Sequence, residues 1–203
     1  MNRRLVLASV AGFATPALLR RALAQNAPAP AGGRPPQLSA ARETHIKDTL
    51  AVGSLSLMLS RIARPKVNTP RLLQFTEFEI AEQETVANIL TAIRNGEAPS
   101  GAVPSPSDAE AMQAIDPAGR SQVEKFRQMG GGPAFDREYL RAEIDGHNRL
   151  LQIQQTYLRA PDDLDETNVA KLAQGMIKEH LTLLGDLQGT GGEHAEQTRG
   201  HLR

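Results

Sequence analysis

Two histidines and a glutamate in the C-terminal half of the chain are the residues whose types and spacing could do chemistry. His147 lies in a helical pattern over 133–158 and His180 in a second one over about 163–187, each on the apolar side of its helix. A histidine on an apolar side needs partners for its ring nitrogens. Those partners could be a metal ion, a carboxylate or ordinary core groups, and this choice is the main functional question that the sequence poses.

Helix geometry is expected to bring the two rings and Glu143 to one level. The turn between the two helices lies near 160–163, so at about 1.5 Å per residue the histidines differ by only about 6 Å along the helix axes. Side chains lean toward the N-terminus of their helix, so His147 leans away from the turn and His180 leans toward it. Glu143 precedes His147 by one turn on nearly the same face. We therefore expect these three side chains to meet inside the protein.

Two imidazoles and a carboxylate suit a divalent transition metal such as zinc, iron, manganese or copper. A zinc site normally has four ligands, so the other half of the protein should contribute. The helical pattern over 70–95 offers Glu79, Glu82 and Gln83, of which Glu82 and Gln83 fall on its apolar stripes. The predicted metal ligands are His147, His180, Glu143, Glu82 and Gln83.

Other arrangements fit the same residues. The histidines could be neutral core residues that hydrogen-bond to each other, to Glu143 or to a hydroxyl, or their rings could be exposed. Glu143 could also turn to the solvent and pair with Arg141 or Lys178. The distance between the ring nitrogens of His147 and His180 separates these arrangements. A shared metal with bonds of about 2.0–2.1 Å requires that distance to be within about 4–5 Å.

Capping signals define the first two long helices. The first begins after the N-cap Ser39, runs to about Ile62 and is apolar on most of its sides, so it should be widely buried. The second begins at Thr69-Pro70, a cap followed by proline at the first helical position, and ends at Asn95-Gly96.

Two short helices and two long ones follow. Ser107-x-x-Glu110 is a capping box, and residues 117–129 form a second short helical pattern. The last long helix begins at Asp163 and is predicted to end at Gly189. The residues predicted to face the core are Leu140, Ile144, His147, Leu151 and Leu158 on the third long helix, and Val169, Ala173, Met176, His180, Leu183 and Leu187 on the fourth.

These patterns predict an all-α fold with one domain over residues 38–188. No segment alternates in the manner of a strand. Short connections between long helices imply antiparallel neighbours, so we predict an antiparallel up-down four-helix bundle. A longer, partly helical connection joins its second and third helices.

The N-terminus predicts export. Residues 1–24 have a basic start at Arg3-Arg4, an apolar stretch and Ala22-Leu23-Ala24, the small-x-small pattern of a signal-peptide cleavage site. Arg20-Arg21 cut the apolar stretch too short for a membrane span. The arginine pair is also compatible with the twin-arginine route, and the general route stays open. We predict a signal peptide over 1–24, a flexible leader over 25–37, a disordered tail over 189–203, and a periplasmic or secreted mature protein.

The composition of the chain argues against some classes of partner. The chain has no cysteine, so it forms no disulfide. The first 24 residues hold four of the 23 basic residues and none of the 23 acidic ones, which leaves the rest with a net charge of −4. That balance, with no tryptophan and only 3% aromatic residues, argues against a nucleic-acid partner. The mature chain is expected to have no transmembrane anchor.

The same C-terminal residues resemble a known family. Phe135-Asp136-x-x-Tyr139, His147 eight residues later and Glu179-His180-Leu181 are similar to the second half of the ferritin-like domain of unknown function 4142 family. The stretch from Gly53 to Ala63 and Phe75 fit its first half more weakly, and the resemblance covers about residues 40–188.

The resemblance implies an exported bacterial four-helix bundle with no assigned activity. It also implies an acidic residue where Ser56 stands and Asp-His where Glu82-Gln83 stand. A di-iron centre of the Glu-x-x-His type is not expected, because Ile144 and Ile177 lie three residues before the two histidines.

Three functions remain open at this stage. The first is a binding or protective role without catalysis, since no nucleophile motif or phosphate loop is present. The second is a mononuclear metal-binding protein that uses the residues above. The third is self-association or docking of a partner helix, suggested by the apolar character of the first helix.

Overall fold

Six α-helices and no strand make up the described part of the chain, which confirms the all-α prediction. The structure is a computed structural model that describes residues 37–98 and 100–200, with side chains up to residue 189. The predicted signal peptide and all but the last residue of the leader lie outside the described residues. The helices are α1 (Ala40–Ala63), α2 (Pro70–Asn95), α3 (Asp108–Ala114), α4 (Pro117–Gln128), α5 (Pro133–Leu158) and α6 (Leu164–Gly200).

The helix ends follow from local capping chemistry. Ser39 Oγ accepts a hydrogen bond from the backbone N–H of Arg42 at 3.1 Å, and Ser107 forms a complete capping box with Glu110. At the end of α2, Gly96 adopts a left-handed conformation with φ 64°, which glycine reaches without steric cost. The helix ends predicted at these residues are confirmed.

The last helix is longer than the sequence predicts. We expect it to end at Gly189, but α6 continues to Gly200. A glycine inside a helix costs only about 1 kcal/mol relative to alanine, and no proline follows Gly189 to stop the helix. Glycine alone was therefore too weak a signal for the end of this helix. No helix in the described part of the chain is both long and apolar enough to cross a membrane.

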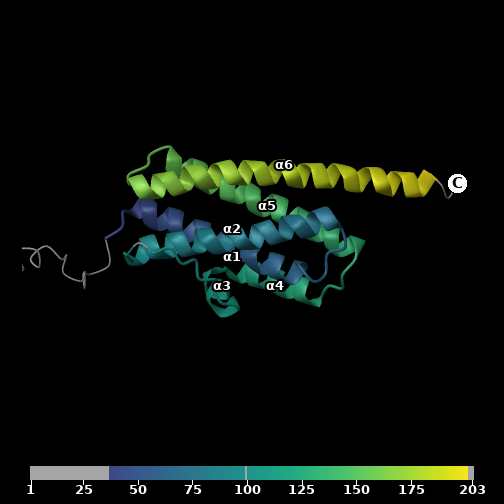
Figure 1. The fold of residues 1–203 in the computed structure, drawn as a ribbon, viewed down its shortest axis with the longest axis horizontal. Helices are drawn as coiled ribbons and strands as arrows, with labels where there is room; N and C mark the ends of the chain where they lie inside the picture. The colour runs from purple at the N-terminus through teal and green to yellow at the C-terminus, as the bar shows by residue number, and fades with distance from the viewer. Residues whose placement is uncertain (1–36, 99, 201–203) are drawn as a thin grey trace, which may run out of the picture. The chain divides into compact units, whose positions relative to one another are not determined.

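Helix α1 is the most central element. It packs against α2, α5, α3 and α4, while α6 packs against α5 and, over a smaller contact, against α2. Figure 1 shows α3 and α4 below the long helices, on the opposite side from α6. The sides of α1 are thus covered within the chain itself, which accounts for its nearly all-round apolar character.

The connection from α2 to α5 adds an apolar core at one end of α1. Phe126 of α4, Phe135 of α5 and Met58 of α1 are buried together there. The ammonium of Lys66, in the turn after α1, donates to the carbonyl oxygens of Phe126, Arg127 and Met129 at 2.8 Å each. This lysine satisfies carbonyls at the C-terminal end of α4, where a positive charge is favourable.

The core-facing rows of α5 and α6 differ from those predicted. On α6 the buried row is Glu166, Ala170, Ala173, Ile177, His180, Leu184 and Leu187, whereas Leu183 is 40% exposed. On α5 the buried row is Phe135, Asp136, Tyr139, Glu143, His147, Leu150, Gln154 and Tyr157. Predicted core residues such as Leu140, Ile144 and Leu151 flank these rows and are half-buried. Burial is confirmed for His147, Ala173, His180 and Leu187. The other positions were misplaced because the prediction followed apolar residues, while several core positions are polar.

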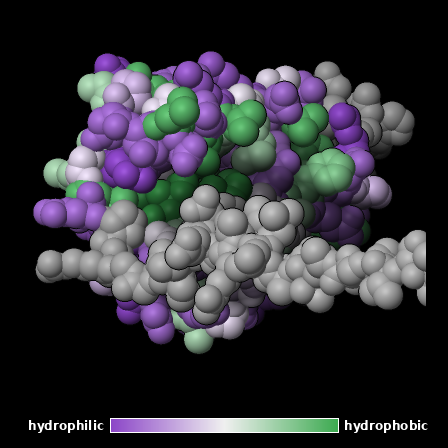
Figure 2. Space-filling view, turned by 60° about the vertical axis from the view of Figure 1, so that its left-hand side comes forward, coloured by the Kyte–Doolittle hydropathy of each residue, from purple (hydrophilic) through white to green (hydrophobic). Residues whose placement is uncertain are grey.

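Some apolar residues of α2 reach the surface. Phe78 is 48% exposed and Ile89 is 37% exposed. Figure 2 shows that one face of the molecule carries hydrophobic side chains among hydrophilic ones. The row of α2 that faces the core contains Phe75, Glu79, Gln83 and Leu90 in their place.

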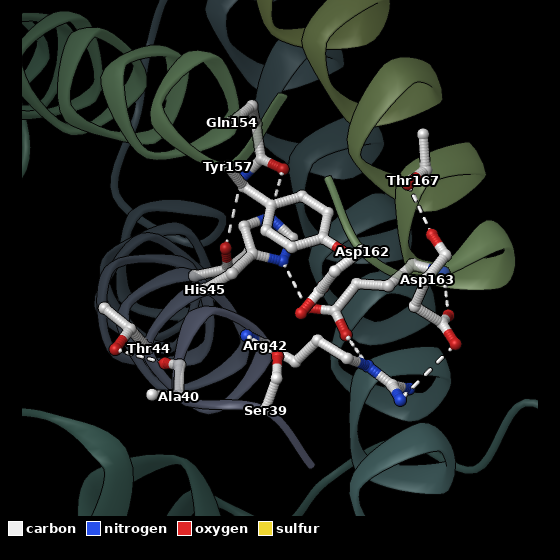
Figure 3. A network of polar contacts seen from close by, with 12 residues as sticks. Ser39, Ala40, Arg42, Thr44, His45, Gln154, Tyr157, Asp162, Asp163 and Thr167 are labelled. Carbon is white, nitrogen blue, oxygen red and sulfur yellow. Dashed lines mark hydrogen bonds and ion pairs between the residues drawn. The ribbon is translucent and has the colours of Figure 1, made fainter. Parts of the chain in front are cut away.

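A buried polar network, here called the Glu166 network, joins α1, α5 and α6. Glu166 has no exposed surface, and its two carboxylate oxygens lie 2.6 Å from His45 Nδ1 and 2.9 Å from Arg42 Nε. The other ring nitrogen of His45 lies 2.7 Å from Gln154 Oε1, and the ring stacks on Tyr157 (Figure 3). Each polar atom of the His45 ring thus has a partner, so this network fixes the start of α6 against α1 and the end of α5.

We predict that Glu166→Ala lowers the free energy of unfolding by about 3 kcal/mol, because it removes the buried hydrogen-bond partner of both His45 Nδ1 and Arg42 Nε. Urea denaturation followed by circular dichroism measures the change. The exposed neighbour Asp165 provides the control, and Asp165→Ala should cost less than about 1 kcal/mol. Equal losses in the two variants would contradict a structural role for the Glu166 network.

Candidate metal centre

Three buried side chains from three helices converge in the protein interior. Glu79 comes from α2, His147 from α5 and His180 from α6, and each lies in the core-facing row of its helix. Their residues are 0%, 1% and 5% exposed, respectively. We call this group the histidine–glutamate cluster.

The cluster has one donor atom from each residue at its centre. His147 Nε2 lies 3.0 Å from His180 Nδ1, and Glu79 Oε2 lies 3.3 Å from the first nitrogen and 3.1 Å from the second. The predicted convergence of the two histidine rings is confirmed. Among the described residues, Glu79 Oε2 has no partner at hydrogen-bond geometry although the atom is fully buried. A buried carboxylate oxygen in that situation is costly unless something else satisfies it.

These distances suit a metal ion. Bonds of about 2.0–2.2 Å place neighbouring ligand atoms of one metal about 3.0–3.5 Å apart, which matches the triangle of the cluster. The three atoms could therefore bind one ion on a common face and leave its opposite side open. Two histidines and one carboxylate arranged in this way are typical of sites for divalent transition metals.

Contacts on the outer side of each ring orient the histidines. His147 Nδ1 donates to the backbone carbonyl of Glu143 at 2.8 Å, so Nε2 is the nitrogen that faces the cluster. His180 Nε2 lies 3.0 Å from Glu82 Oε2, so Nδ1 faces the cluster. Backbone carbonyls and carboxylates hold metal-binding histidines in the same way in known metal sites.

A row of hydroxyl and carboxyl groups continues from the cluster toward α1. Ser56 Oγ lies 2.6 Å from Glu79 Oε1 and 2.5 Å from Glu143 Oε2, and Ser60 Oγ lies 2.7 Å from the hydroxyl of Tyr139. The hydroxyl of Ser56 has one proton and can donate to one carboxylate only. The second contact therefore requires that one of the two carboxyl groups is protonated and donates to Ser56.

The electrostatics identify Glu143 as that protonated group. Burial raises the pKa of Glu143 to about 8, and the nearby negative charge of Glu79 adds to this shift. Burial would also raise the pKa of Glu79, but the charge of His147 and contacts with His180 and Ser56 outweigh it and hold that pKa below its usual range. Glu79 is thus the charged member of this pair, whereas Glu143 is biased toward its neutral form.

Both histidines are biased toward the charged form in the protein without metal. Burial alone would lower the pKa of His180, but the carboxylates of Glu79 and Glu82 outweigh burial and raise it to about 10. Burial alone would also lower the pKa of His147, but the carboxylate of Glu79 outweighs burial and raises the pKa of His147 above its ordinary value. A metal ion that binds the cluster must therefore displace protons.

The structure places the five predicted ligands in different surroundings. His147 and His180 lie at the centre of the cluster. Glu82 lies at its outer edge, and Glu143 contacts Ser56 and, at 3.7 Å, the Nδ1 atom of His147 that faces away from the centre. Gln83 is buried against α1, where a Cβ on Gly53 would come within 2.4 Å of its side-chain oxygen.

Glu79 is the cluster residue that the sequence prediction did not select. It stands four residues before Gln83 in the core-facing row of α2, but the apolar stripes used for the prediction pass on either side of it. Spacing measured from Leu72 and Phe75 would have indicated this row. His45 and Glu166 were missed for the same reason, since a polar residue does not mark an apolar stripe.

The fold and the cluster together define a class, an all-helical protein with two histidines and a carboxylate converging in its interior. Within that class, the chain belongs to the family described as domain of unknown function (DUF4142), whose model matches residues 27–188. This match confirms the family resemblance read from the sequence. Comparisons with curated proteins and with solved structures give no match.

We predict that the metal-free protein loses stability as the pH rises from about 6.5 to about 10. The folded-state pKa of His180 is raised from 6.5 to about 10, so its contribution is complete below pH 6.5 and is lost as the pH rises through 10. Glu143, with a folded-state pKa of about 8, acts in the same direction. Urea denaturation of chelator-treated protein at several pH values measures the decline.

The variant His180→Gln isolates the histidine contribution and should show a shallower decline over this pH range. Glu77→Gln, an exposed change on α2, serves as the control and should follow the wild type. A His180→Gln variant with the full wild-type decline would contradict this assignment of charge.

Proposed function

We propose that the protein binds one divalent transition-metal ion in the interior of a four-helix bundle, with Glu79, His147 and His180 as ligands. The observation that carries the proposal is the buried Oε2 atom of Glu79, which faces two histidine nitrogens without a hydrogen-bond partner among the described residues. A cation at the centre of the three atoms would satisfy all of them at once. Glu143, Glu82 and Gln83, predicted as further ligands, are proposed to surround the ion rather than bind it.

The bundle in this proposal consists of α1, α2, α5 and α6. Contacts run from α1 to α2, from α2 to α6, from α6 to α5 and from α5 back to α1, so the four helices enclose a common interior. Short turns join α1 to α2 and α5 to α6, as an up-down arrangement requires. The ferritin-like label then describes the fold only and assigns no activity.

The composition of the cluster favours some metals over others. Imidazole and carboxylate ligands suit zinc, iron(II), manganese or copper, whereas calcium and magnesium prefer sites built from oxygen alone. The ligands are at most 5% exposed, which leaves little access for a substrate. We therefore propose storage, sensing or transfer of the metal, and no catalytic role.

Metal binding should raise the thermal stability of the purified protein and saturate at one ion per chain. At a free metal concentration of about 100 times Kd, binding raises the free energy of unfolding by about 2.7 kcal/mol. Calorimetric titration and thermal unfolding of chelator-treated protein with Zn²⁺, Mn²⁺ and Co²⁺ measure both quantities. A melting temperature that is unchanged by each of the three metals would contradict the proposal and favour a binding or protective role without metal.

Two variants separate the cluster from unspecific acidic binding. Glu79→Gln keeps the size of the side chain but removes its charge, and we expect it to lose at least about 10-fold in metal affinity. Glu77→Gln removes the same charge from the surface of the same helix and should bind as the wild type does. Equal binding by the two variants would place the metal elsewhere on the protein.

We further propose that the protein is exported after removal of residues 1–24. The basic start, the apolar stretch and Ala22-Leu23-Ala24 support this proposal. Export through the twin-arginine route would let the protein fold and bind its metal before it crosses the membrane.

N-terminal sequencing of protein recovered from the periplasm should give a start near Gln25. Replacement of Arg3 and Arg4 by lysine tests the route, because it should block export if the twin-arginine machinery is used. Unchanged export would assign the general route, and recovery of uncleaved protein from the cytoplasm alone would contradict export.

A further inference from the structure

Glu82 connects the histidine–glutamate cluster to the surface. Its side chain is 31% exposed, whereas those of Glu79 and His147 are 0% and 1% exposed and that of His180 is 6% exposed. Glu82 belongs to α2 and His180 to α6, so the contact between them crosses the junction of these two helices. Any ion that reaches the cluster from solvent along this junction meets Glu82 first.

His180 presents ring nitrogens to both sides of this route. Its Nε2 atom lies 3.0 Å from Glu82 Oε2 on the outer side, and its Nδ1 atom lies 3.1 Å from Glu79 Oε2 on the inner side. Both carboxylate oxygens are buried atoms without a hydrogen-bond partner among the described residues. Two positions that each combine a carboxylate oxygen with an imidazole nitrogen at ion-pair distance therefore lie on opposite edges of one ring.

Partly exposed apolar side chains flank the outer position. Helices α2 and α6 share a smaller contact than α1 shares with α2 or α5 with α6. Phe78, one turn before Glu82, is 48% exposed, and Leu183, one turn after His180, is 40% exposed. With apolar side chains on both sides, Glu82 supplies the negative charge that can attract a cation to this junction.

We propose that Glu82 and the outer nitrogen of His180 capture the incoming divalent cation and pass it to the inner position formed by Glu79, His147 and the other nitrogen of His180. This inference rests on the proposed function and adds the route by which the ion reaches its site. Glu82 belongs to the uptake path and is absent from the final set of ligands.

Glu82 orients the ring of His180, and kinetics separates that role alone from an additional contact with the incoming ion. A residue of the uptake path increases the rates at which the ion binds and leaves, so its loss slows both steps and leaves Kd nearly unchanged. A residue that only orients a ligand stabilises the bound state, so its loss speeds departure and weakens Kd.

Stopped-flow mixing of chelator-treated full-length protein with Co²⁺, followed by the visible absorption of bound cobalt, measures the association rate. Competition with excess chelator then gives the dissociation rate. For Glu82→Gln we expect both rates to fall by about 10-fold or more, with Kd within about three-fold of the wild-type value. Glu77→Gln, which removes an exposed charge elsewhere on α2, should change each rate by less than about two-fold.

The other results overturn the inference in recognisable ways. Faster dissociation with unchanged association in Glu82→Gln would make Glu82 a positioning residue. Rates equal to those of Glu77→Gln would place the uptake path elsewhere. An absence of saturable cobalt binding in the wild type would contradict the proposed function itself, whereas binding with altered kinetics only in Glu82→Gln supports both.

Discussion

The rest of the structure depends on one buried negative charge, the carboxylate of Glu79. An isolated carboxylate in a protein interior is unstable unless cations or hydrogen-bond donors surround it. Helix α2 carries this carboxylate, and the other three long helices supply those groups, with Ser56 from α1, His147 from α5 and His180 from α6. This requirement fixes which face of each helix points inward, and it places polar residues where apolar ones are usual.

Polar groups at the centre divide the core into separate apolar regions. Apolar clusters lie around Phe126 and Phe135 at one end and around Ile46 and Leu90 on another side, and the Glu166 network holds the start of α6. The family motif fits this division. Phe135 fills the apolar end. Asp136 accepts hydrogen bonds from the backbone N–H and the hydroxyl of Thr69, the residue before α2. The hydroxyl of Tyr139 hydrogen-bonds to Ser60 beside the cluster. These three residues of the motif thus support the cluster, to which the motif's two histidines, His147 and His180, belong.

The helices could be predicted from the sequence because their ends carry local signals, such as Ser39, the capping box at Ser107 and Gly96. The approach of His147 and His180 could also be predicted, since it follows from helix rise and side-chain lean. Glu79, His45 and Glu166 could not be found in this way. Burial of a charged residue depends on partners from other helices, and no periodic apolar pattern within one helix reveals them. The long end of α6 was missed because glycine is only a weak helix breaker.

The central claim is that one metal ion lies between Glu79, His147 and His180. Anomalous diffraction from a crystal of the protein loaded with Co²⁺ tests it most directly. We predict a single strong peak within about 2.0–2.3 Å of Glu79 Oε2, His147 Nε2 and His180 Nδ1. A cluster that stays free of metal in a cobalt-loaded crystal, or a peak held by surface carboxylates alone, would contradict it.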